Sequence, residues 1–123
     1  MKYLCLVYAE EATLDAMPQA EIDTLVDESL ANDEDLRESG HLVLAQALDQ
    51  VVAATTVRVR NGRLSATDGP FAETNEQLGG FVLIEARDLN EAIRIAGRIP
   101  SARLGSIEVR PVIDLIERVR SPQ

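Results

Sequence analysis

The chain has 123 residues, 46% of them hydrophobic and 27% charged, which is the composition of one globular domain with an aliphatic core. Its 21 acidic and 12 basic residues give a formal net charge of -9, which argues against nucleic acid and anionic membranes as partners. One cysteine and one histidine give no reason to expect an internal disulfide or a metal site, and no cofactor-binding fingerprint is present.

The first predicted element is a strand over residues 2–10, in which apolar side chains fall on both faces. One face carries Tyr3, Cys5 and Val7, and the other carries Leu4, Leu6 and Tyr8. A strand with this pattern is buried on both sides, so we expect Cys5 to be a buried hydrophobe rather than a reactive thiol.

A helix is predicted over residues 18–39, because Pro18 suits the first helical position and Gly40 provides a stop. Apolar residues at near-helical spacing predict a buried stripe: Ile22, Leu25, Val26, Leu30 and Leu36. Acidic residues occupy the predicted solvent-facing side: Asp23, Asp27, Glu28, Asp33 and Glu34.

A second strand is predicted over residues 41–48, and a hairpin follows over residues 55–67. In the hairpin, Asn61 and Gly62 favour the left-handed backbone angles of a type I′ turn. Arginines alternate there with valines, as expected of a strand with one apolar face.

The stretch TDGPFAETNEQLGGF, residues 67–81, interrupts the series of short strands. Its DGP sequence predicts a tight turn, after which Phe71 is the only large apolar side chain available to anchor the loop. Thr74 and Gln77 favour one short helical turn, and the Gly pair before the next strand permits close backbone approach. Its length is also typical of loops that line binding sites.

Three elements complete the chain: a strand over residues 79–86 that is again apolar on both faces, a helix, and a strand over residues 106–115. Asp88 is the predicted N-cap of the helix, with Glu91 in the capping-box position. The order predicts an α+β, ferredoxin-like βαββαβ sandwich with an inserted hairpin strand, with the first and third long strands at the centre. We expect one domain over residues 1–123. Cytoplasm is the expected location, because no signal-peptide-like or membrane-spanning segment is visible.

Two helices can cover only one face of such a sheet. Leaving Tyr3, Cys5 and Val7 in water would expose more contiguous apolar surface than monomers usually carry. We therefore expect a homodimer in which two sheets pack face to face by twofold symmetry, forming a dimeric α/β barrel.

The motifs DGPFAET, EQLGGF and EVRPV, in that order within residues 55–112, resemble the DGPF group of the YCII-related family. The segments MKYLCLVYAEE and LRESGHLVLAQAL also fit the family pattern, so the resemblance covers nearly the whole chain. It implies a single YCII-related (DGPF) domain and a dimeric α/β barrel. Members or relatives have been linked by association with extracytoplasmic-function sigma factors, which implies a regulatory protein as a further partner.

The wider family includes members with a proposed His–Asp acid–base pair, in which the histidine lies early in the chain. This sequence departs from that pattern, because its single histidine is His41. Six residues are the candidate ligand-binding set: Asp68, Phe71, Glu73, Arg58, Arg110 and His41.

Each candidate role has a structural alternative. Asp68 is the best candidate acid or base, with Glu73 next, but either side chain can simply support the turn. Arg58 and Arg110 could bind an anion, or be solvated and ion-paired respectively. His41 follows a helix, where the dipole alone favours an imidazolium.

Two functions remain open from the sequence. The favoured one is a binding or accessory module that holds a small organic ligand beside the DGPF loop or meets a regulatory protein. It is favoured because no nucleophile elbow, phosphate loop or His dyad is present. The alternative is an acid–base enzyme of isomerase or lyase type, with Asp68 as proton carrier and an arginine stabilising the resulting anion.

Overall fold

The computed structural model describes residues 1–120 and has an α+β fold. Its main sheet contains four antiparallel strands in the order β2-β5-β1-β6. They are Lys2–Ala9 (β1), Leu42–Ala47 (β2), Gln77–Glu85 (β5) and Ser106–Pro111 (β6). The prediction that the first and third long strands lie at the centre is confirmed.

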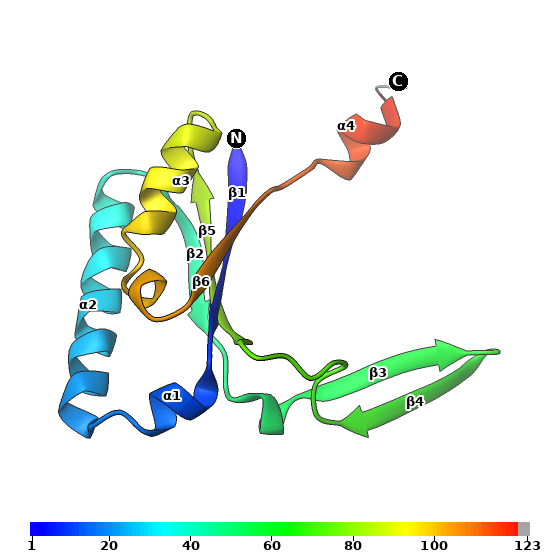
Figure 1. Ribbon diagram of the computed structural model, residues 1–123. Coiled ribbons are helices and arrows are strands. Elements are labelled where there is room, and N and C mark those ends of the chain that lie inside the picture. Colours follow the sequence, from blue (N-terminus) through cyan, green and yellow to red (C-terminus); the bar gives the residue numbers. More distant parts are fainter. Residues whose placement is uncertain (121–123) are drawn as a thin grey trace.

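Within residues 1–120, six helical segments connect or follow the strands. They are α1 (Glu11–Asp15), α2 (Gln19–Glu38), η1 (Val51–Ala53), α3 (Leu89–Gly97), η2 (Pro100–Arg103) and α4 (Leu115–Arg120). Figure 1 shows α2 and α3 on the same face of the main sheet, whereas α4 projects from the body.

The core lies between the main sheet and helices α2 and α3. Tyr3 and Cys5 of β1 are buried there together with Ile84 of β5, and they pack with Leu36 of α2 and Ile95 of α3. The expectation that this face of β1 needs a second subunit is therefore wrong, because the helices of the same chain cover it. The other face of β1, formed by the residues that alternate with Tyr3 and Cys5, is the one that the helices leave uncovered.

Helix α2 lies mainly over η2 and the edge strand β2, and its buried Leu36 reaches the core at the centre of the sheet. Only part of its predicted apolar stripe is covered as a result: Leu36 is buried, but Val26 is 50% exposed and Leu30 is 63% exposed. Pro18 is the N-cap rather than the first helical residue. Gly40, with φ of +81°, ends the helix as predicted.

The final strand is shorter than predicted, because Pro111 ends β6 instead of continuing to residue 115. Proline has no N–H to offer a strand ladder, so it belongs at a strand end. The Asp114 carboxylate then accepts hydrogen bonds from the N–H groups of Ile116 and Glu117, at 2.8 and 3.2 Å, and caps α4.

The predicted hairpin is confirmed as β3 (Thr55–Arg60) paired with β4 (Arg63–Asp68), which form a separate two-stranded sheet. Asn61 and Gly62 both have positive φ, 53° and 74°, as a type I′ turn requires. Figure 1 shows the hairpin projecting on the side of the main sheet that faces away from α2 and α3.

Candidate functional site

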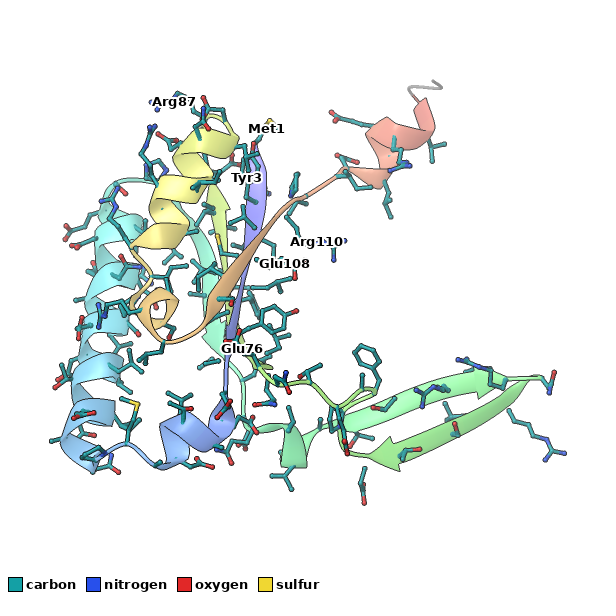
Figure 2. All side chains as sticks on the ribbon, in the orientation of Figure 1. Met1, Tyr3, Glu76, Arg87, Glu108 and Arg110 are labelled. Atoms are coloured by element: carbon teal, nitrogen blue, oxygen red, sulfur yellow. The ribbon has the colours of Figure 1, made fainter. Side chains whose placement is uncertain are left out.

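The sheet face opposite the helices is defined by the strand register, because residues paired across neighbouring strands share a face. Arg110 lies opposite Leu4 and Glu108 lies opposite Leu6. Figure 2 shows Arg110 and Glu108 on the side away from the helices. Continuing the register gives the full set, here called the open face: Leu44, Gln46, Leu78, Phe81, Leu83, Glu85, Lys2, Leu4, Leu6, Tyr8, Ser106, Glu108 and Arg110.

The centre of the open face is apolar. Four side chains there are half-buried by their neighbours alone: Leu4 and Leu6 of β1, and Phe81 and Leu83 of β5. Leu44 on the edge strand is 45% exposed. Neither α2 nor α3 covers these side chains, since both helices lie on the other face. Contiguous apolar areas of this kind are frequent where proteins bind ligands or partners, so the open face is the candidate site.

Polar side chains border this apolar centre along β6. The Ser106 hydroxyl donates to Glu76 Oε1 at 2.8 Å, and Arg110 Nε lies 3.8 Å from Glu108 Oε2. Tyr8 lies opposite Ser106 in the register. The border thus offers a guanidinium for an anionic group and carboxylates for a donor, beside an apolar floor.

Backbone geometry fixes the first half of the DGPF loop, which follows β4 at Asp68. Gly69 has φ of +98°, a conformation that favours glycine. Its N–H donates to the Ala54 carbonyl at 2.7 Å, and its own carbonyl accepts from Thr56 Oγ1 at 2.8 Å. The Asp68 carboxylate is exposed.

The second half of the loop differs from the prediction. Phe71 is 80% exposed, so it does not anchor the loop within its own chain. The expected helical turn is also absent, because Gln77 pairs with Ala9 and begins β5. The Gln77 side chain instead donates to the Thr74 carbonyl at 2.6 Å and accepts the Glu11 N–H at 2.9 Å, which ties the loop to the start of α1.

The structure distributes the six candidate residues over three places. Arg58, Asp68, Phe71 and Glu73 are exposed on the hairpin and DGPF loop, Arg110 lies on the open face, and His41 lies between α2 and β2. No hydrogen bond or ion pair within the described part of the chain joins any two of them.

The surroundings of His41 are structural. Its Nδ1 lies 2.8 Å from the Glu85 carbonyl and 4.0 Å from Glu91 Oε1, near the start of α3. The ligand-binding roles of the six residues stay predictions.

The sequence pattern of the YCII-related domain matches residues 1–116, almost the whole chain. The chain belongs to the YCII-related family. It is also 37% identical over 114 residues to an uncharacterised protein of Rhizobium meliloti (strain 1021), an alignment that covers 91% of this chain and 92% of that relative. The resemblance inferred from the motifs is confirmed, and the relative's name carries no activity.

In this YCII-related domain the polar border is the part of the site that sequence reasoning missed. Arg110 is the only one of these residues in the candidate set, although Ser106, Glu108 and Arg110 alternate with apolar residues in SIEVRP. That period of two was a sufficient signal that the three side chains share one face. The contribution of Glu76 gave no such signal, because it comes from an irregular segment before β5.

Three further findings concern the domain. Burial raises the pKa of the Cys5 thiol to about 11. No group of three His, Cys, Asp or Glu side chains within residues 1–120 has the arrangement of a metal site. None of the helices described there has the length and apolar character needed to cross a membrane.

Proposed function

We propose that this YCII-related protein is a homodimeric module that binds a small organic ligand between the open faces of two copies. The observation that carries the proposal is the open face itself, an apolar floor with a charged border and no helical cover. A second copy is the simplest cover, because a twofold axis places the same apolar area on both partners.

Two projecting segments support a dimer. The hairpin and α4 both extend on the side of the open face, so they flank it (Figure 1). Helix α4 carries exposed apolar residues at helical spacing: Leu115 at 68%, Ile116 at 64% and Val119 at 82%. A second copy on the open face would cover these side chains and the sheet together.

The border residues define the class of ligand. Arg110 is 69% exposed and its ion pair with Glu108 is long and solvated, so it contributes little and an anionic group can replace it. Leu4, directly opposite Arg110, provides an apolar surface beside the guanidinium. A small carboxylate with an apolar body fits both features, with the exposed Phe71 ring of the DGPF loop as an additional contact.

The dimer is tested with two leucines of nearly equal exposure, Leu44 on the open face at 45% and Leu89 on α3 at 48%. Leu44→Asp should convert the protein to a monomer in size-exclusion chromatography with light scattering, because it places a charge in the proposed interface. Leu89→Asp should leave the dimer intact. A monomeric wild type, or equal effects of the two variants, would contradict the proposal.

The ligand is tested with a series of aliphatic and aromatic monocarboxylates in titration calorimetry. Binding should occur in the wild type and be lost in Arg110→Gln, while Arg94→Gln, on exposed α3 surface, should bind as the wild type does. Carboxylates that bind equally to Arg110→Gln would exclude Arg110 as the anion site.

The acid–base alternative stays a prediction, and Asp68→Asn separates it from the proposal. If Asp68 is only a turn residue, the variant keeps ligand binding; if Asp68 carries a proton, the variant keeps binding but loses turnover.

A further inference from the structure

A groove of about 410 Å³ lies between α2 and the main sheet. Its walls are α2 and η2, and strands β1, β2 and β5 contribute its floor. Pockets for small molecules usually have volumes of about 300–1,000 Å³ and largely apolar linings. All of these elements belong to one chain, so the groove does not depend on the homodimer of the proposed function.

Small residues of the sheet leave the space for this groove. Ala47 of β2 lies opposite Gly80 of β5, and Gly80 in turn lies opposite Val7 of β1. Ala45 and Val82 form the next pair along the helix-covered face. Two of these residues offer only a methyl group and one offers only a hydrogen, where larger side chains would fill the space beneath α2. The sequence thus leaves room between helix and sheet instead of continuing the core.

The walls of the groove are apolar. Leu25 and Leu30 line it from α2, and Ile99 and Pro100 line it at the start of η2. Leu30 is 63% exposed, so a ligand in the groove would cover apolar surface that the chain itself leaves in water. These walls therefore suit a ligand with an aliphatic or aromatic body.

One charged side chain lines the groove within residues 1–120, the carboxylate of Asp33. Asp33 is half-buried and lies four positions after Ser29, so the two side chains adjoin on the surface of α2. The Ser29 hydroxyl donates its hydrogen to the Leu25 carbonyl at 2.8 Å, which leaves its oxygen lone pairs for a ligand. A carboxylate beside a hydroxyl acceptor favours a ligand that carries hydrogen-bond donors and a positive charge.

Arg37 neutralises Asp33 only in part. It lies one turn further along α2, and its guanidinium pairs with Glu34. Burial raises the pKa of the Asp33 carboxyl, and the charge of Arg37 does not fully offset the rise. Because burying an incompletely paired carboxylate costs free energy, a cation in the groove would offset that cost. The field of the helix favours the same charge, since α2 contains eight acidic residues and one base.

We propose that the groove between α2 and the sheet binds a small organic ammonium ion, with its nitrogen at Asp33 and Ser29 and its apolar body against the floor. This site goes beyond the proposed function. The carboxylate site proposed above lies at Arg110 on the open face, whereas this one lies on the helix side of the sheet and takes a ligand of opposite charge. Either site can therefore fail its test without affecting the other.

The charge requirement is tested with hexylammonium and 1-hexanol, which share one apolar body, in titration calorimetry at neutral pH. The wild type should bind the ammonium ion about tenfold or more tightly than the alcohol, because hydrogen bonds to ionised groups are the stronger ones. Asp33→Asn should remove this preference. Asp35→Asn, an exposed change in the same helix, should keep it. Equal affinity of the wild type for the two probes, absence of binding, or the same loss in both variants would overturn the proposal.

The place of binding is tested by filling the floor of the groove. Ala47→Leu leaves the charge unchanged but occupies the space beneath α2, so it should weaken the binding of hexylammonium by about tenfold or more. Ala31→Leu is the matched control, because Ala31 is an exposed residue of α2 outside the groove, and this variant should bind as the wild type does. Undiminished binding in Ala47→Leu would place the ammonium ion elsewhere and refute the groove as its site.

Discussion

Asp88 and Glu91 together cap α3, with the Glu91 N–H donating to Asp88 Oδ1 at 2.9 Å. The Glu91 carboxylate in turn accepts the N–H of Arg87, one residue before the N-cap, at 2.8 Å. The two carboxylates thus satisfy two backbone donors at the start of the helix. This cap is the one predicted from the sequence. Because its acceptors are carboxylates, its contribution to stability depends on pH.

We expect Glu91→Gln to destabilise the protein at neutral pH. The backbone N–H of Arg87, followed by the Arg87 guanidinium and His41, lowers the pKa of the Glu91 carboxyl, although burial opposes the shift. A carboxyl with a lower pKa in the folded state stabilises the fold above its unfolded pKa, and this contribution is lost as pH falls through the folded value. The difference in Tm between wild type and variant should therefore disappear in acid. A difference that persists there would contradict the cap's ionic character.

Asp33→Asn should have the opposite effect and raise Tm at neutral pH. Asp33 lines the groove between α2 and the sheet, and burial there raises the pKa of its carboxyl, which Arg37 only partly offsets. Because the folded state prefers the protonated form, the ionised carboxylate destabilises the fold above the folded pKa. The gain should vanish in acid, where both states are protonated. Asp35→Asn, an exposed change in the same helix, should leave Tm unchanged, and a loss of stability in Asp33→Asn would show that the carboxylate is needed there.

The order of the strands, the hairpin turn and the α3 cap could be predicted because each follows from local patterns. Alternation along β1 revealed two apolar faces but could not decide which one the helices cover, since that depends on how α2 and α3 cross the sheet. The same limit applies to the site. The sequence pattern predicts both Arg110 and Asp68 as candidate site residues. Their positions on different sheets follow from long-range strand pairing rather than from local sequence.

Cys5 should be nearly inert toward thiol reagents in the native protein. It is fully buried, and burial raises its pKa to about 11, so almost no thiolate exists at neutral pH. A Val52→Cys variant provides the comparison, because Val52 is 82% exposed on η1. Disulfide exchange with an aromatic reagent should modify the introduced cysteine rapidly and Cys5 only after denaturation. Rapid reaction of the native wild type would mean that β1 is accessible.

Gly105 should be the least replaceable glycine of the chain. A Cβ atom at this position would lie 2.0 Å from the Tyr8 carbonyl oxygen and 2.9 Å from Ala9 Cα, both of them backbone atoms that cannot move aside. Gly105→Ala should therefore separate β6 from β1 and cost about 3 kcal/mol or more in unfolding free energy, measured by urea denaturation. Gly97→Ala is the matched control. Gly97 lies in α3 with open space around it, so this substitution should raise the unfolding free energy by up to about 1 kcal/mol through higher helix propensity. If both substitutions shifted stability in the same direction, close backbone approach would not be the reason for glycine at position 105.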